Sequence, residues 1–242
     1  MELLLSLFLL FNTAMGGNPE EPNKWMKMLG SVSTSTQHQQ PVSTSPDRPG
    51  QAQSGPSDPQ KDTAPKIKGI YVTAYSAGGS KNWPILLDLV DQTELNAMVI
   101  DIKDDYGYIT YKTDNPELLK LGTDQNYIRD IRQLMATLKR HEIYPIARIV
   151  VFKDSVLAKK HPELSFRKGD GSVWANGKGD SFVNPYNKEV WDYNVAIAKE
   201  AAKLGFKEIQ FDYVRFPEGF ENKADYLTFK RTDESRTDIV AG

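Results

Sequence analysis

The pattern of apolar and polar positions divides the chain into two parts of different character. From residue 66 onward, strand-like and helix-like segments alternate and are dense in Ile, Val, Leu, Tyr and Phe. The stretch from about residue 30 to residue 65 has almost no large apolar side chain. Alternating strand and helix units are typical of a parallel sheet with crossover helices. We therefore predict one α/β domain over residues 66–242, preceded by a leader.

Four segments of the domain have the pattern of strands, and three have that of helices. The run Met98-Val99-Ile100 is apolar on both faces, as in strands buried inside a parallel sheet. A stripe of apolar residues repeats at helical spacing between residues 126 and 141. The predicted strands cover residues 67–75, 97–102, 144–152 and 207–214, and the predicted helices cover residues 83–92, 126–141 and 188–204.

This order of elements fits either an open doubly wound sheet or the first half of a (β/α)8 barrel. The segment after the first strand, residues 75–80, lacks the G-x-G-x-x-G spacing of a dinucleotide site. Polar residues gather instead where successive strands end, as in barrel enzymes. They are Tyr75, then Asp101, Lys103, Asp104 and Asp105, then Arg148 and Lys153, then Asp212 and Arg215. We predict an α/β fold of the (β/α)8 TIM-barrel type, truncated to about its first four β/α units.

Asp212 stands at the tip of an apolar, β-rich run that extends from residue 209 to residue 217. A charge at the end of an otherwise buried strand is costly unless it is paired or has a chemical task. Asp212 is therefore the first candidate for catalysis, with Arg148 or Arg215 able to hold it ionised. The alternative is a structural ion pair that closes the strand end, and Arg215 could equally pair with an acidic neighbour.

Composition and charge exclude several classes of function. The formal net charge is −2 and the pI is near 6.0, without a cluster of Lys or Arg on one element, so we expect no nucleic acid partner. The chain has no Cys, which excludes disulfides, thiolate metal sites and Cys nucleophiles. Its three histidines, His38, His141 and His161, suit neither a zinc site nor a Ser-His-Asp triad. We expect no metal and no cofactor.

The N-terminal part has the features of an exported protein. Residues 3–11 form an apolar run of the length of a signal-peptide core, and the small residues Ala14 and Gly16 follow it. Glu2 stands where a basic residue is usual, so a misplaced start or a loosely packed helix are alternatives. We predict a signal peptide or hydrophobic segment over residues 1–17 and a disordered Ser/Thr/Pro/Gln-rich linker over residues 18–65. The expected location is secreted or at the cell surface, where this part could associate with the cell wall or the membrane surface.

The strand segments also resemble a known family. The resemblance is carried by K-G-I-Y-V-T at residues 68–73, N-A-M-V-I-D-I-K-D at 96–104, I-A-R-I at 146–149 and F-D-Y-V-R-F-P at 211–217. Together they look like the uncharacterised glycoside hydrolase domain of bacterial exported proteins, a TIM-barrel group similar to the α-amylase-type glycosidase barrels. The resemblance implies hydrolysis of an extracellular or cell-surface polysaccharide or oligosaccharide by a bacterium.

The length of the chain departs from that family. A whole barrel needs about 250 residues and eight strands, whereas only four strands are visible after the linker. In related glycosidase barrels the carboxylate on the fourth strand is often the nucleophile, and the proton donor comes from a later strand. The resemblance therefore implies a donor beyond Gly242, and we expect a truncated product or fragment. The alternatives to a glycosidase are a non-catalytic carbohydrate-binding or wall-associated module and an inactive gene fragment.

Glycoside hydrolysis needs two carboxyl groups, one to protonate the leaving oxygen and one to attack or to activate water. Asp212 fits the attacking role. Asp101 and Lys103 share a strand face by the period of two and would both point into the barrel mouth, with Asp104 on the loop above. They could bind sugar hydroxyls, or Asp101 could supply the second carboxyl. The alternative is a solvated acidic turn over residues 104–108 that leads into a short hairpin, and for Asp105 this alternative is favoured.

Aromatic side chains offer the stacking surface and the polar handle that sugars bind. Trp174 is the strongest candidate, because it lies in the long Gly-rich loop at residues 168–177, where burial in a core is least expected. Asn184 follows in the same rim. Most aromatic residues of a barrel are core or surface cover, which is the alternative for the others. The candidates are Tyr71, Tyr75, Trp174, Tyr186 and Tyr213.

Overall fold

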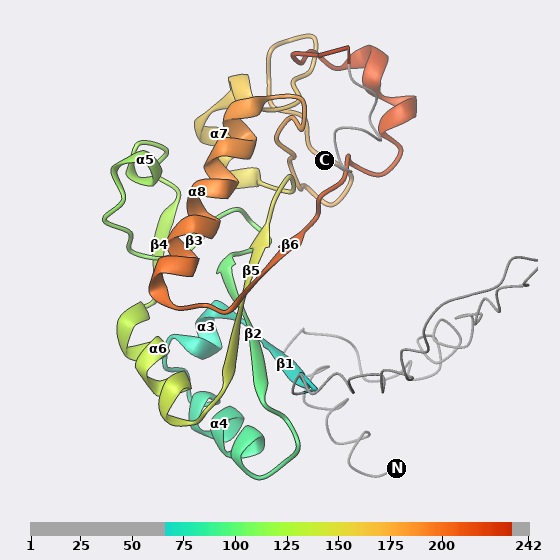
Figure 1. Ribbon diagram of the computed structural model, residues 1–242. Helices are drawn as coiled ribbons and strands as arrows, with labels where there is room; N and C mark the ends of the chain where they lie inside the picture. The colour runs from blue at the N-terminus through green and yellow to red at the C-terminus, as the bar shows by residue number, and fades with distance from the viewer. Residues whose placement is uncertain (1–65, 234–242) are drawn as a thin grey trace, which may run out of the picture. The chain divides into compact units, whose positions relative to one another are not determined.

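The computed structural model describes residues 66–233 of the chain (Figure 1). The signal segment predicted over residues 1–17 and the linker predicted over residues 18–65 lie outside the described residues. The described strands are β1 (Gly69–Val72), β2 (Ala97–Lys103), β3 (Ile109–Tyr111), β4 (Asp124–Ile128), β5 (Tyr144–Val150) and β6 (Glu208–Asp212). The α-helices are α3 (Ala74–Ala77), α4 (Trp83–Asp91), α5 (Pro116–Leu119), α6 (Ile131–Arg140), α7 (Ser155–Lys160) and α8 (Lys188–Leu204).

The four strands predicted from the sequence form a parallel sheet in chain order. β1 pairs with β2, β2 with β5, and β5 with β6, all parallel. A doubly wound sheet would reverse its strand order at a switch point, and no reversal occurs among these strands. The order is that of successive β/α units of a barrel. The predicted TIM-barrel-type α/β fold is therefore confirmed.

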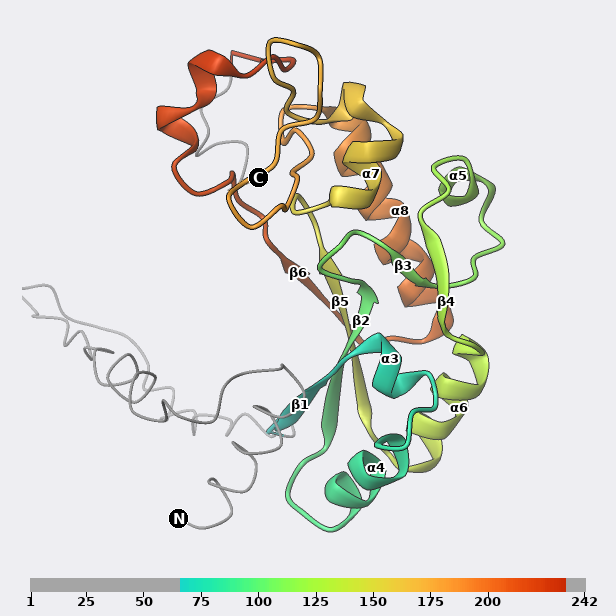
Figure 2. The same ribbon diagram turned by 180° about the vertical axis from the view of Figure 1, so that it is seen from behind.

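The long helices cover one face of these strands. α4, α6 and α8 lie on the same side of β1, β2, β5 and β6 in both views (Figures 1 and 2). One hydrophobic cluster joins them to that face, with Leu87 of α4, Leu138 of α6 and Ile197 of α8 packed against strand residues such as Ile100 and Ile149. The other face of the sheet carries Asp101, Arg148 and Asp212 near the strand ends.

A segment that contains β3, α5 and β4 follows β2 and was predicted only in part. β3 runs antiparallel to β2 and is joined to it by a tight turn, as the expected hairpin requires, and β4 then pairs parallel to β3. The sequence prediction of a helix over residues 126–141 was too long at its start. Asp130 caps α6 by accepting a hydrogen bond from Gln133 N at 2.9 Å, so the helix begins at Ile131 and the preceding residues are free to form a strand.

The first predicted strand was also too long. Thr73 Oγ1 accepts a hydrogen bond from Ser76 N at 3.2 Å, which caps α3 and ends the extended backbone after Val72. Tyr75 therefore lies on a helical turn rather than at a strand tip, and its side chain is 75% exposed. The helix over residues 188–204 was predicted with its observed bounds, because Asn187 caps its start and Gly205, with a φ of 107°, ends it.

Candidate functional site

The ends of three neighbouring strands meet at one guanidinium, that of Arg148 on β5. Arg148 is in register with Asp101 on β2 and with Gln210 on β6, so Asp212, two residues further along β6, faces the same way. Arg148 Nη1 donates to Asp101 Oδ1 at 2.7 Å. Its Nε and Nη2 donate to Asp212 Oδ2 at 3.0 and 2.7 Å. The sequence suggested Arg148 or Arg215 as the partner of Asp212, and in the structure Arg148 is the one that contacts it.

Asp101 lies behind the guanidinium and is held from both sides. The hydroxyl of Tyr71 donates to Asp101 Oδ2 at 2.5 Å, and the Tyr71 ring centroid lies 5.6 Å from Arg148 Cζ. Burial raises the pKa of Asp101 above its ordinary value, although the hydrogen bonds from Tyr71 and Arg148 oppose the shift. Burial also raises the pKa of Tyr71 above its usual range, so the phenol stays a proton donor to Asp101.

Asp212 is accessible where Asp101 is not. The exposed fraction of the side chain is 43% for Asp212, 11% for Arg148 and 5% for Asp101. Desolvation disfavours the charge on Arg148, but its hydrogen bonds to Asp101, Asp212 and Asp105 outweigh that effect and raise its pKa above its usual value. Arg148 therefore stays charged and presents Asp212 to solvent.

Asp105 joins this group from the turn between β2 and β3. Its Oδ1 lies 3.4 Å from Arg148 Nη2 and 3.9 Å from Lys153 Nζ, and its side chain is 41% exposed. Sequence reasoning favoured a solvated turn for Asp105, because nothing local shows that this turn folds back over the end of β5. We call Tyr71, Asp101, Asp105, Arg148 and Asp212 the Arg148 cluster.

Lys153 and Arg215 flank the aromatic residue that follows Asp212. The ring centroid of Tyr213 lies 5.1 Å from Lys153 Nζ and 5.1 Å from Arg215 Cζ. Arg215 Nη2 also lies 3.5 Å from Glu218 Oε1, which is the acidic neighbour that the sequence allowed. Lys153 Nζ is 3.6 Å from Asp180 Oδ1, a residue that sequence reasoning missed because it comes from a long loop without periodicity.

Lys103 does not share a face with Asp101, which corrects the prediction. The register of β2 against β5 shifts between these two residues, so the strict alternation of side chains ends there. Lys103 is fully buried, with Nζ 2.7 Å from Asp154 Oδ2 and 3.1 Å from Asn194 Oδ1. Desolvation lowers the pKa of Lys103 and raises that of Asp154, while their contact opposes both shifts. Lys103 is therefore out of reach of a sugar at the Arg148 cluster.

Three further residues that were predicted to bind a sugar, Asp104, Trp174 and Asn184, make contacts within the fold instead. Asp104 Oδ1 accepts hydrogen bonds from the backbone N–H groups of residues 106, 107 and 108 and so builds the turn. Asn184 is 1% exposed and uses both ends of its amide on the backbone. Trp174 is half-buried, with its ring 6.5 Å from that of Phe182, because the Gly-rich loop folds over a second aromatic cluster.

Two kinds of feature are absent from residues 66–233 of the structure, a metal-ligand group and a membrane-spanning helix. In that range no group of three His, Cys, Asp or Glu side chains is arranged to hold a metal ion. None of the helices there is both long and apolar enough to cross a bilayer.

A parallel, barrel-type sheet with ionisable side chains gathered at the carboxyl ends of its strands has the layout of (β/α)-barrel proteins, which build their sites at that end. Within this class of barrel proteins, the chain matches one protein family. The family described as "Putative glycosyl hydrolase domain" matches residues 69–242, and the chain belongs to it. No curated protein matches the chain.

Solved structures give further similarities. The chain is similar to a hypothetical protein from Ruminiclostridium thermocellum, with 35% identity and a TM-score of 0.64 over 71% of this chain and 87% of that one. An α-galactosidase from Thermus thermophilus matches with 19% identity and a TM-score of 0.44, over 67% of this chain and 34% of that one. An inactive variant of exo-β-N-acetylglucosaminidase from Vibrio harveyi matches with 18% identity and a TM-score of 0.49, over 65% and 29%.

Proposed function

We propose that this domain hydrolyses glycosidic bonds with Asp212 as the attacking carboxylate, either as nucleophile or as the base that activates water. The observation that carries the proposal is the contrast between two carboxylates on one guanidinium. Arg148 binds Asp101 and Asp212 equally closely, but the side chain of Asp212 is 43% exposed and that of Asp101 only 5%. A sugar can approach Asp212, whereas Asp101 orients Arg148 from behind.

Asp105 is the second carboxyl of the proposed reaction. Asp105 Oδ1 and Asp212 Oδ2 both contact Arg148 Nη2, at 3.4 and 2.7 Å, so these two oxygens are at most about 6 Å apart. Paired carboxyl groups of glycosidases are separated by ~5–5.5 Å when the configuration is retained and ~6.5–9.5 Å when it is inverted. Asp105 is also half-exposed, so a sugar can approach it as well as Asp212.

The substrate in this proposal is a polysaccharide or oligosaccharide outside the cytoplasm. The apolar run at residues 3–11 and the Ser/Thr/Pro-rich segment behind it support an exported protein. Fractionation of cells that express the full chain, with detection of an epitope at its C-terminus, would test this. A full-size product in the cytoplasm alone would contradict export.

The catalytic assignment is tested by hydrolysis of a panel of glycans, measured as new reducing ends. We expect Asp212→Asn to lower the rate by about 10²–10⁴-fold, because it removes the attacking charge. The matched control is Asp88→Asn on the exposed face of α4, which should retain the wild-type rate. Equal rates for the native chain and Asp212→Asn would reject Asp212 as the catalyst. Binding of a glycan without any product would favour a carbohydrate-binding module.

A further inference from the structure

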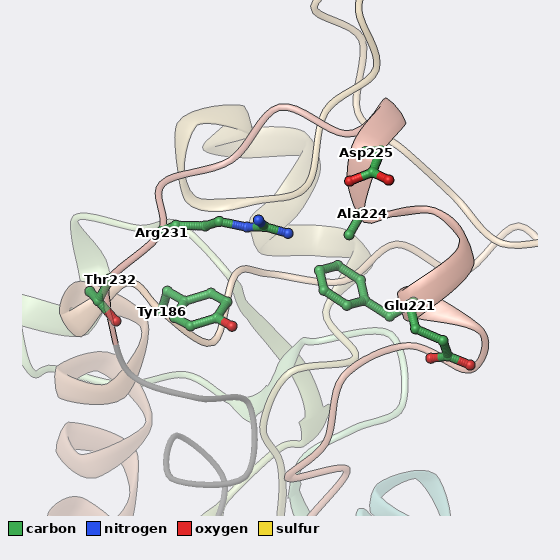
Figure 3. Close-up of a pocket in the computed structure, with 7 residues that line it drawn as sticks. Tyr186, Glu221, Ala224, Asp225, Arg231 and Thr232 are labelled. Carbon is green, nitrogen blue, oxygen red and sulfur yellow. The ribbon is translucent and has the colours of Figure 1, made fainter.

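A cavity lies between Tyr186 and the segment that follows β6. Its volume is ≈ 430 Å³, and we call it the aromatic pocket (Figure 3). None of the residues that line it belongs to the Arg148 cluster. They are Tyr186, Phe220, Glu221, Ala224, Asp225, Arg231 and Thr232.

The aromatic side of the pocket is a continuous group of rings. Tyr186 is stacked on Phe229 with centroids 6.2 Å apart and 20° between the planes, and it meets the edge of Phe216 at 5.4 Å. Phe216 lies 4.9 Å from Phe220, which is 2% exposed. Phe216 is also only four residues beyond Asp212. The pocket is thus anchored to the strand that carries the proposed catalytic residue.

A buried amide joins the two sides of the aromatic pocket. Asn184 Oδ1 accepts a hydrogen bond from Tyr186 N at 3.1 Å, and Asn184 Nδ2 donates to Lys230 O at 2.7 Å. Lys230 directly precedes Arg231. Because Asn184 is 1% exposed, it fixes Tyr186 relative to Arg231 before any ligand arrives. Asn184, which the sequence suggested as a sugar-binding residue, therefore positions other residues of the pocket.

Three polar side chains that line the pocket, Tyr186, Asp225 and Arg231, are available to a ligand. Within residues 66–233, neither the Asp225 carboxylate nor the Tyr186 hydroxyl makes a hydrogen bond or an ion pair. The Arg231 guanidinium contacts the Phe229 ring at 4.9 Å and has no carboxylate partner in that range. Figure 3 shows Arg231 and Tyr186 directed toward the space beside Ala224 and Asp225, while the Glu221 carboxylate points away from Arg231.

The aromatic ring, the carboxylate and the guanidinium that line the pocket match the chemistry of a neutral sugar. A pyranose offers hydroxyl groups that both donate and accept hydrogen bonds, and a C–H face that packs on an aromatic ring. Asp225 accepts, Arg231 donates and Tyr186 supplies a ring with a hydroxyl. The lining carries two carboxylates, Glu221 and Asp225, and one guanidinium, Arg231, so it disfavours an anionic sugar unit relative to a neutral one.

We propose that the aromatic pocket is an additional glycan-binding subsite that holds a neutral sugar unit of the polysaccharide on which the Arg148 cluster acts. This proposal rests on the proposed function for the identity of the ligand. If the subsite exists, the affinity for an oligosaccharide depends on its number of sugar units, because only longer ligands reach both the Arg148 cluster and the aromatic pocket.

The test is calorimetric titration of the full chain carrying Asp212→Asn, so that binding is measured without turnover. The probes are cello-, malto- and chito-oligosaccharides from disaccharide to hexasaccharide. We expect Tyr186→Ala and Arg231→Gln each to weaken binding of the longest ligand by about tenfold, and to leave the disaccharide unaffected. Tyr186→Phe keeps the ring and should lose less. The matched control is Tyr226→Ala, a 75% exposed tyrosine of the same segment that does not line the pocket.

Three outcomes would overturn the subsite: binding of none of the oligosaccharides, no loss of affinity in Tyr186→Ala, or an equal loss in Tyr226→Ala. A urea midpoint equal to that of the Asp212→Asn parent shows that a variant is folded. The proposed function fails separately. If the native chain hydrolyses none of the bound ligands but Tyr186→Ala still weakens their binding, the subsite stands and the hydrolase assignment falls.

Discussion

At the scale of single residues, the backbone just after Asp212 is the unusual feature of the site. Tyr213 has a φ of 53°, in the left-handed region that residues other than Gly rarely occupy. Its N–H donates to Asp212 Oδ1 at 2.7 Å, and its ring lies between Lys153 and Arg215. Such a conformation costs ~1–3 kcal/mol and persists only where surrounding contacts hold it. We infer that this turn directs the Asp212 carboxylate toward Arg148.

Substitution of Tyr213 separates the role of its backbone from that of its ring. Glycine adopts the left-handed conformation without strain, whereas valine does so poorly. We expect Tyr213→Gly to retain more hydrolysis and a higher free energy of unfolding than Tyr213→Val, measured by reducing-end release and by urea unfolding. If the two variants lose activity equally and both raise KM, the ring itself contacts the sugar and the backbone conformation is incidental.

At the scale of elements, two charged side chains at the end of β2, Asp101 and Lys103, lie on opposite faces of the sheet. Asp101 reaches Arg148 on the open face, and Lys103 reaches Asp154 beneath α8. Asp154 also caps α7 through Leu157 N at 2.7 Å, and it lies so close to Gly107 that an added Cβ there would meet Asp154 Oδ1 at 1.9 Å. The buried pair therefore joins β2, α7 and the turn that carries Asp105.

Breaking this pair should cost far more than removing both charges. Lys103→Met leaves Asp154 as a buried charge without a partner, and we expect a loss of ~3–5 kcal/mol in the free energy of unfolding. The double variant with Asp154→Asn keeps a capping oxygen for α7 and should recover most of that loss. Urea unfolding of the two variants measures the difference. A single variant as stable as the native chain would mean that Asp154 is neutral in the folded protein.

At the scale of the whole described domain, strand order decides where chemistry can occur. Because β1, β2, β5 and β6 follow one another without a reversal, all three long helices pack on one face (Figure 2), and Asp101, Arg148 and Asp212 meet on the other. The segments that hold the Arg148 cluster and the aromatic pocket both extend from the carboxyl ends of these strands. Proposed catalysis and proposed binding therefore lie at the same end of the sheet.

The elements that were predicted well have strong local signals. α8 has an Asn cap, an apolar stripe and a terminal Gly, and its bounds were predicted as observed. β4 was mistaken for the start of a helix, because residues 124–128 are mostly polar and the apolar stripe of α6 continues into them at Ile128. Its strand conformation comes from pairing with β3, a contact that periodicity does not encode.

The sequence by itself determined the fold class and which charged residues stand at strand ends, because side-chain period and apolar runs are local properties of the chain. Only the tertiary structure decided which of them meet. Asp212 and Arg148 are 64 positions apart and are joined by strand pairing. Asp101 and Lys103 are separated by a shift in register that no alternation reveals. A residue's chemistry is set by its side chain, but its burial and its partners depend on neighbours that are distant in the chain.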